Sequence, residues 1–267
     1  DARDLGIKIL MDLVPSHCSI EHRWFIAALA SDPNSPERAR FYFRDGKGDA
    51  GNEPPNNWQS AFGGPAWTRL DADPAANNGK GGQWYLHTFA REQPDLDHTH
   101  TDVHQLFDEI FKFWFDRGVE GFRVDAVAGT GKHPDLPNQP PVGPEVGVLD
   151  ITWMNEYTVF RPEGHDVWRR FRATIDNYES GHPGRELMMV AEAYAVRRPE
   201  LVKAFTEPDQ FHQMFSFDLM LTPWEKHSIE QAMLDPIAIL AKTGVPPAWT
   251  LNNHDIQRIV TRLGRSD

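Results

Sequence analysis

Short apolar runs alternate with amphipathic segments along most of the chain. Residues 7–14 (IKILMDLV) form an apolar, β-branched run that begins after Gly6 and stops at Pro15, which is typical of a buried parallel strand. Similar runs predict four further strands, over 121–127, 186–191, 213–218 and 248–252. Helices are predicted between them, over 103–117, 166–177, 199–205 and 228–242. This alternation predicts an α/β fold with a parallel sheet, either doubly wound or part of a (β/α)₈ barrel.

The helix before the second strand has the clearest pattern. Its apolar residues recur at spacings of three and four, at positions 103, 106, 107, 110, 111 and 114. Asp102 is placed to cap its N-terminus, and Gly118 to end it.

Residues 18–93 break the alternation. Pro, Gly and Asn cluster in GKGDAGNEPPNN and DADPAANNGKGG, and aromatic residues are scattered between them. A structureless loop of this length is improbable in a compact domain. We therefore predict a small inserted subdomain over 18–93, with residues 1–17 and 94–267 forming the barrel domain.

Charge and composition narrow the range of partners. The chain has 27 basic and 39 acidic side chains, a formal net charge of −12, which repels phosphate backbones and anionic lipids. No run approaches the roughly 20 apolar residues of a membrane span. Cys18 is the only cysteine, which excludes an intrachain disulfide and a cysteine-rich zinc cluster. We expect a small-molecule ligand, no nucleic-acid or membrane partner, and a cytoplasmic location.

Polar side chains follow four of the five predicted strands. In α/β folds the chemistry lies at this carboxyl edge of the sheet, where the connecting loops converge. The residues concerned are Asp12, His17, Arg123, Asp125, Glu192, His254 and Asp255.

Two of these carboxyl groups have contrasting environments. Arg123 and Asp125 are two residues apart, so they share a face of their strand and the arginine keeps the aspartate ionised. Glu192 lies in the mostly apolar MMVAEAYA, where desolvation should raise its pKa. One ionised and one protonated carboxyl group are what hydrolysis of a glycosidic bond requires. A closed or curved sheet would bring Asp255 to the same pocket.

Five segments around these residues carry a family resemblance. They are DLVPSH (12–17), QPDLDH (93–98), GFRVDAV (121–127), VAEAY (190–194) and NNHDIQR (252–258). In this order they resemble glycoside hydrolase family 13, the α-amylase superfamily, and within it the oligo-1,6-glucosidase and α-glucosidase branch. The resemblance implies that Asp125 is the nucleophile, Glu192 the acid/base and Asp255 the carboxylate that clamps sugar hydroxyls.

The resemblance also implies substrate contacts and a substrate class. The implied sugar-binding residues are His17, Arg123 and His254, with Phe62 of SAFGGPAW as an apolar wall and Arg258 as a further contact. The QPDL segment is similar to that of glucosidases, which implies a retaining α-glucosidase that releases terminal glucose from short oligosaccharides. Ala126, directly after the implied nucleophile, resembles enzymes that prefer α-1,4 links. Linkage preference and oligomeric state stay open.

The chain departs from the family pattern in places. Ser16 replaces an asparagine, and QPDLDH replaces QPDLNW. In the family's barrel the five segments belong to strands three to seven, so we expect a truncated chain that lacks strands one, two and eight. The family's calcium or magnesium loop would lie in the missing front, so no cofactor is expected here. Expressed alone, the chain should show no α-glucosidase activity.

Other interpretations remain open for each residue. Arg123 and Asp125 can form a purely structural ion pair, Glu192 can be a solvated loop residue, Asp255 can cap a helix, and Phe62 can belong to the core. His17 and His254 can be ordinary hydrogen-bonded histidines. Two alternative functions are a metal-dependent barrel hydrolase, with ligands from His98, His100, Asp102 and His104, and a non-catalytic sugar-binding relative.

Overall fold

The computed structural model describes residues 2–70, 82–140, 156–196, 198–241 and 243–264. They divide into two units, each assembled from separate stretches of the chain. Unit 1 contains residues 1–13, 114–127 and 168–267, and unit 2 contains residues 14–113 and 128–167.

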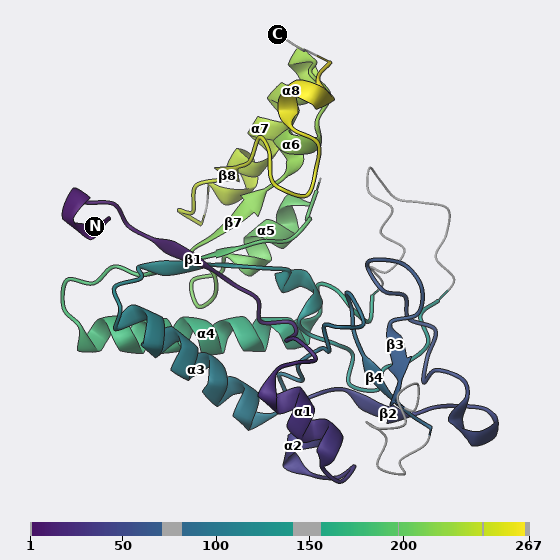
Figure 1. Ribbon diagram of the computed structural model, residues 1–267. Coiled ribbons are helices and arrows are strands. Elements are labelled where there is room, and N and C mark those ends of the chain that lie inside the picture. Colours follow the sequence, from purple (N-terminus) through teal and green to yellow (C-terminus); the bar gives the residue numbers. More distant parts are fainter. Residues whose placement is uncertain (1, 71–81, 141–155, 197, 242, 265–267) are drawn as a thin grey trace. The chain divides into compact units, whose positions relative to one another are not determined.

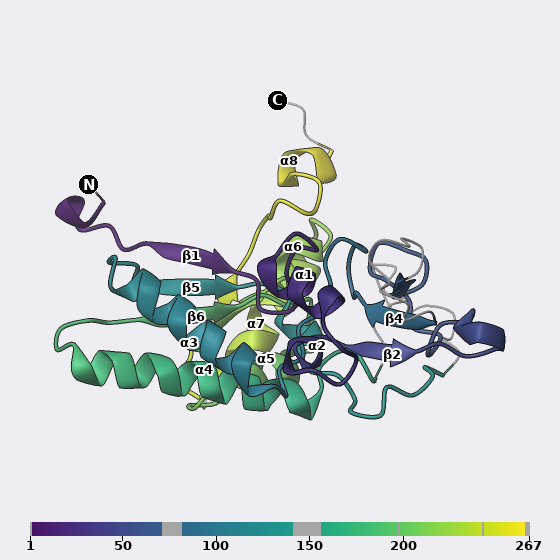
Figure 2. The same ribbon diagram turned by 60° about the horizontal axis from the view of Figure 1, so that its bottom comes forward.

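Unit 1 is built on a five-stranded parallel sheet (Figure 1). Its strands, in spatial order, are β1 (Leu10–Leu13), β5 (Gly121–Val124), β6 (Met188–Ala191), β7 (Gln213–Ser216) and β8 (Ala248–Trp249). Figure 2 shows β1, β5 and β6 lying side by side and pointing the same way. The five predicted strands are confirmed, and each paired segment is shorter than the apolar run that predicted it. The α/β class and the parallel sheet follow from this arrangement.

Close packing of β5 between its neighbours explains the glycine that opens GFRVDAV. A Cβ atom on Gly121 would clash with the carbonyl oxygen of Met188 on β6. The same position faces Leu10 on β1, its register partner. Glycine therefore allows the three strands to approach at their amino ends.

The helices of unit 1 alternate with these strands along the chain. They are α5 (Pro199–Phe205), α6 (Asp218–Leu221), α7 (Lys226–Leu240), α8 (Ile259–Arg262) and the part of α4 (Pro162–Gly181) from Trp168 onward, with the 3₁₀ turn η1 (Arg3–Leu5) near the start. Trp168 is fully buried, and its ring lies 5.1 Å from that of Phe211. The helix predicted over 199–205 is confirmed with the same bounds, and those predicted over 166–177 and 228–242 are confirmed with shifted ends. Lys242 lies outside the described residues.

Unit 2 has an antiparallel three-stranded sheet in the order β2 (Phe43–Asp45), β4 (Gln83–Leu86), β3 (Trp67–Arg69). Its helices are α1 (Arg23–Ala30), α2 (Pro36–Ala39) and α3 (Thr101–Phe115), and the last two residues of α3 belong to unit 1. Its 3₁₀ turns are η2 (Asp49–Gly51) and η4 (Val127–Gly129), and the first residue of η4 is the last residue of its stretch of unit 1. One core cluster contains Tyr42, Trp58, Ala66, Trp67, Leu86 and Leu136. The predicted inserted subdomain over 18–93 falls within this unit, and its boundaries stay a prediction.

The predicted start of α3 requires a correction. Asp102 is not the cap, because the helix already includes Thr101 and the backbone amide of Asp102 donates to Nδ1 of His100. The Asp102 carboxylate instead forms an ion pair of 2.6 Å with Arg40. Gly118 follows the helix with φ of +94°, a conformation that favours glycine, as predicted. Among the described helices, none is long and apolar enough to cross a bilayer.

Candidate active site

A single arginine of unit 1 contacts carboxylates from three neighbouring strands. Asp12 on β1 and Arg123 on β5 are register partners, so their side chains lie on the same face of the sheet. Nη1 of Arg123 lies 2.7 Å from Oδ1 of Asp12 and 2.5 Å from Oδ1 of Asp125, and Nη2 lies 3.7 Å from Oε2 of Glu192. The predicted contact of Arg123 with Asp125 is confirmed.

Asp125 stands directly past the end of β5, where the backbone still follows the sheet. Its amide donates to the carbonyl oxygen of Leu13 on β1 with a distance of 2.8 Å. This bond fixes the residue while its carboxylate stays partly exposed. The carboxylate is therefore rigidly placed, paired with a cation and open to a ligand.

Glu192 occupies the equivalent position past the end of β6, and it is only 5% exposed. The interpretation of this residue as a solvated loop residue is therefore wrong. Its Oε2 accepts a bond of 3.1 Å from the backbone amide of Ala126, and within the described part of the chain its buried Oε1 has no hydrogen-bond partner. Burial raises the pKa of Glu192, and the negative charges of Asp125 and Asp255 raise it further, against the opposing effects of the Ala126 amide and Arg123.

Asp255 follows β8 and is held by neighbours in unit 1. Its Oδ2 lies 3.1 Å from the hydroxyl of Tyr194, and its Oδ1 lies 3.5 Å from Nε2 of His254. The residue at the N-cap of α8 is Arg258. Asp255 therefore does not cap that helix, and the capping interpretation is wrong. Arg258 is exposed, and its substrate contact stays a prediction.

The remaining two predicted residues, His17 and Phe62, lie in unit 2. Phe89 brings them together, since its ring centroid lies 5.2 Å from that of His17 and 5.9 Å from that of Phe62. His17 also contacts the hydroxyl of Ser16 at 3.0 Å and the amide of Gln93 at 2.9 Å. Phe62 is 73% exposed, so its interpretation as a core residue is wrong. The substrate contacts of His17, Phe62 and His254 stay predictions.

The histidines considered as metal ligands have other partners. Nε2 of His98 bonds to the carbonyl oxygen of Pro15 at 2.7 Å, and Nε2 of His104 bonds to the carbonyl oxygen of His98. His100 accepts from the Asp102 amide. Over the described ranges, no three His, Cys, Asp or Glu side chains are grouped to hold a metal ion.

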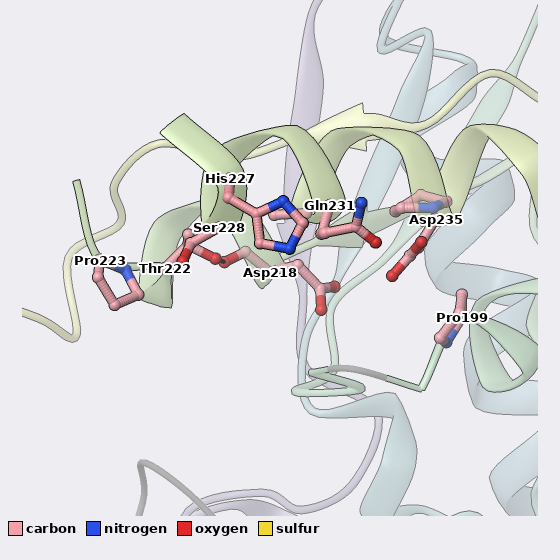
Figure 3. A pocket seen from close by; sticks show the side chains of 10 residues that line it. Pro199, Asp218, Thr222, Pro223, His227, Ser228, Gln231 and Asp235 are labelled. Carbon is pink, nitrogen blue, oxygen red and sulfur yellow. Dashed lines mark hydrogen bonds between the residues drawn. The ribbon is translucent and has the colours of Figure 1, made fainter. Parts of the chain in front are cut away.

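A hollow of about 380 Å³ lies in unit 1 between α5, α6 and α7 (Figure 3). Figure 3 shows Asp218, His227, Gln231 and Asp235 around it, with Pro199 on its opposite rim. None of the predicted site residues lines it. The side chains at the strand ends, rather than this hollow, form the candidate active site.

Comparison with known proteins agrees with the chemistry of the strand ends. The family model described as the catalytic domain of alpha-amylase matches residues 1–267. The chain belongs to the alpha-amylase family of glycoside hydrolases. The family resemblance carried by the five segments is thereby confirmed.

Named relatives place the chain beside glucosidases of this family. It is 33% identical over 274 residues to the oligo-1,6-glucosidase of Parageobacillus thermoglucosidasius, covering 97% of this chain and 44% of that protein. It is 31% identical over 276 residues to Maltase 1 of Drosophila virilis, covering 98% of this chain and 41% of that protein. The chain therefore spans less than half the length of these curated relatives.

Solved structures of two other proteins match the fold. An α-glucosyl transfer enzyme aligns with a TM-score of 0.82 and 29% identity, covering 99% of this chain and 48% of that one. A trehalose-6-phosphate hydrolase of Bacillus licheniformis aligns with a TM-score of 0.79 and 26% identity, covering 98% of this chain and 45% of that one.

Several contacts of the site were not predicted from the sequence. The sequence places Asp12 near a strand end, but its pairing with Arg123 depends on the register of β1 against β5. Tyr194 belongs to a family segment, yet its bond to Asp255 joins residues 61 positions apart. A signal for Asp12 was present, since it is a charged residue inside an apolar run.

Proposed function

We propose that the chain is the catalytic part of a retaining α-glucosidase, with Asp125 as nucleophile, Glu192 as acid/base and Asp255 as the residue that holds sugar hydroxyls. The observation that carries this proposal is the contrast between two adjacent carboxyl groups. Asp125 is paired with Arg123 at 2.5 Å, whereas burial raises the pKa of Glu192. One group is thereby suited to attack a cationic sugar carbon and the other to give up a proton.

In the first step, a carboxylate oxygen of Asp125 forms a bond to the anomeric carbon of the terminal glucose. The bond from that carbon to the leaving oxygen breaks, and the electron pair stays with the oxygen, which takes the proton of Glu192. The unpartnered Oε1 of Glu192 is the atom suited to carry this proton, because Oε2 already accepts from Ala126. The product is a covalent glucosyl ester on Asp125 and a free alcohol.

In the second step, Glu192 is ionised and acts as a base. It takes a proton from water, the water oxygen bonds to the anomeric carbon, and the ester bond to Asp125 breaks. Two displacements at one carbon restore the original configuration, so the sugar is released as α-glucose. Retaining enzymes hold their two carboxyl groups about 5 to 5.5 Å apart. The contact of Arg123 with both groups supports a short separation.

The proposed substrate is a short oligosaccharide with a terminal α-linked glucose. The names of the curated relatives, maltase and oligo-1,6-glucosidase, support this class. The fold proposed for the whole protein is a (β/α)₈ barrel, in which the five parallel strands of unit 1 correspond to strands three to seven.

The test uses the full-length protein and four substrates, maltose, isomaltose, sucrose and trehalose, with product anomers followed by ¹H NMR. The proposal expects glucose to appear first as the α anomer from at least one of them. Initial release of β-glucose would mean a single displacement and would refute the retaining mechanism. Turnover of none of the four would refute the α-glucosidase assignment.

The nucleophile is tested by Asp125→Asn in the same protein. We expect kcat to fall by at least about 10⁴-fold while the substrate still binds, because the amide cannot form the ester. Asp209→Asn, which loses only an exposed ion pair with Arg169, is the control and should keep full activity. A metal-dependent hydrolase would instead retain turnover in Asp125→Asn and lose it with a chelator.

A further inference from the structure

Tyr194 connects two strand ends that are not adjacent in the sheet. It lies two residues after Glu192, past the end of β6, whereas Asp255 lies past the end of β8. The strand between them is β7. The Tyr194 ring crosses the end of β7 by packing on Phe217, with ring centroids 4.7 Å apart and an interplanar angle of 33°. Phe217 is almost fully buried, so it provides a fixed support.

The direction of the hydrogen bonds at the Tyr194 hydroxyl is determined by its partners. The side-chain nitrogen of Asn253 lies 2.8 Å from the hydroxyl oxygen and can only donate. Oδ2 of Asp255 lies 3.1 Å from the same oxygen and accepts. The proton of Tyr194 therefore points to Asp255, and each bond in this chain polarises the next.

The amide of Asn253 also braces the loop that carries Asp255. Its Oδ1 accepts from the backbone amides of Asp255 at 3.1 Å and Ile256 at 3.2 Å. Asn253 thus fixes the Asp255 backbone with its oxygen and the Tyr194 hydroxyl with its nitrogen. The side chain and the backbone of Asp255 are held by one connected network.

Asp255 needs such support because its surroundings are sparse. β8 contains two residues, so few ladder bonds hold the loop that follows, and the Asp255 side chain is about half exposed. Burial, with the nearby charge of Asp255, raises the pKa of Tyr194 to about 12, against the opposing Asn253 bond, so its hydroxyl remains a donor over the working pH range.

We infer that Tyr194 is a positioning residue, which orients the Asp255 carboxylate by donating its hydroxyl to Oδ2, while Oδ1, which lies 3.5 Å from Nε2 of His254, is the oxygen that accepts from a sugar hydroxyl. This inference rests on the proposed function for the part that concerns sugar. The arrangement couples the loop of the proposed acid/base to the loop of the proposed hydroxyl clamp.

The experiment is a double-mutant cycle in the full-length protein, with Tyr194→Phe, Asp255→Asn and the double variant. Tyr194→Phe should lower kcat/KM for an α-glucoside about tenfold, mainly through kcat, because a misplaced charge is felt most in the transition state. In the Asp255→Asn background the same change should have less than about a twofold effect. An equal loss in both backgrounds would overturn the inference, since Tyr194 would then act independently of Asp255.

Tyr178→Phe is the matched control. Its hydroxyl also donates to an aspartate, Asp116 at 2.9 Å, and its ring also packs on a phenylalanine, Phe115. It lies on α4 in unit 1, where its ring also stacks on that of His182. Its removal should leave kcat/KM unchanged within about twofold.

A second measurement does not depend on turnover. Crystal structures of the full-length wild type and Tyr194→Phe should show the Asp255 carboxylate rotated or displaced in the variant, with Asn253 in place. An unmoved carboxylate would overturn the inference whatever the wild type hydrolyses. A displaced carboxylate in a protein that turns over no α-glucoside would support the positioning contact and reject the proposed function.

Discussion

The backbone amide of Ala126 donates a hydrogen bond of 3.1 Å to Oε2 of Glu192. Ala126 directly follows Asp125, so one peptide unit links the proposed nucleophile to the proposed acid. A second backbone bond, from the amide of Val127 to the carbonyl oxygen of Glu192 at 3.1 Å, reinforces this link. The two carboxyl groups are therefore placed by the backbone as well as by Arg123.

Ala126 makes this contact in the left-handed conformation, with φ of 48°. In the left-handed region of φ and ψ, the steric clash of the Cβ atom with the backbone costs a residue about 1 to 2 kcal/mol. Ala126→Gly should therefore raise the free energy of unfolding by up to about 1 kcal/mol, and Ala126→Val should lower it, because a β-branched residue is poorly accommodated there. Urea denaturation of the full-length protein measures both. A valine variant as stable as the glycine variant would contradict the conformational argument.

The pH dependence of stability should change when Glu192 cannot ionise. Its folded-state pKa is raised above the unfolded value, so its protonated form favours folding at low pH, and this contribution is lost as pH rises through the folded pKa. The stability of Glu192→Gln relative to the wild type should therefore increase from pH 4 to pH 8, by about 1.4 kcal/mol for each unit of pKa elevation. Thermal denaturation across this range would show a constant difference if the pKa were not raised.

Arg123 should be important for stability as well as for chemistry. Arg123→Met leaves three carboxyl groups close together without their shared cation, and we expect a loss of about 2 to 4 kcal/mol with loss of turnover. Arg169→Met is the control, because its ion pair with Asp209 is exposed and should be worth less than about 1 kcal/mol. Similar losses of unfolding free energy in the two variants would mean that the ion pairs of Arg123 stabilise the fold no more than an exposed ion pair does.

Unit 2 contains a buried ion pair, Lys132 with Asp95 at 3.1 Å, in which both side chains are almost fully enclosed. The Lys132 ammonium also donates to the Thr88 hydroxyl at 3.0 Å and to the carbonyl oxygen of Gly129. Lys132→Met would leave the buried Asp95 carboxylate without its cation, although the Thr88 amide and hydroxyl still donate to it, and should cost about 3 to 5 kcal/mol.

Two further variants test the origin of this cost. Adding Asp95→Asn to Lys132→Met removes the unpaired charge and should recover part of the stability. Lys8→Met, which breaks an exposed pair with Glu186 at 2.6 Å, should leave the free energy of unfolding nearly unchanged. A double variant less stable than Lys132→Met alone would contradict the explanation by an unpaired charge.

His212 should make the protein sensitive to acid. Burial, helped by the charge of Arg172 and opposed by that of Asp176, lowers its pKa to about 4, and its Nδ1 accepts from the amide of Met189 on β6. The depressed pKa of this base means that its contribution to stability is present above pH 6.5 and is lost as pH falls towards 4. His212→Asn, which keeps an acceptor without titrating, should flatten the stability profile between these values. An unchanged profile would exclude His212 as its source.

The sequence predicted best the features that depend on local periodicity. The apolar runs located five strands, and the two-residue spacing of Arg123 and Asp125 placed their side chains in contact. The apolar surroundings of Glu192 likewise predicted the direction of its pKa shift. Each of these follows from residues adjacent in the chain.

Contacts between distant segments could not be derived in this way. The pairing of Asp12 with Arg123 requires the strand register, and the bond of Tyr194 to Asp255 requires the paths of two loops. The cap predicted at Asp102 is wrong for a local reason, because the His100 ring supplies the acceptor to the helix amide and Arg40 pairs with the Asp102 carboxylate. Asp is a favoured cap, but composition alone does not show which acceptor is used.

The division of the chain into two units separates two sets of residues. Asp12, Arg123, Asp125 and Glu192, with all their mutual ion pairs, belong to unit 1, whereas His17 and Phe62 belong to unit 2. A chimera that takes residues 14–113 and 128–167 from a relative would replace the second set and inherit the first unaltered. Recombination at these junctions thus offers a route by which the proposed substrate contacts can diversify while the proposed bond-breaking groups are preserved.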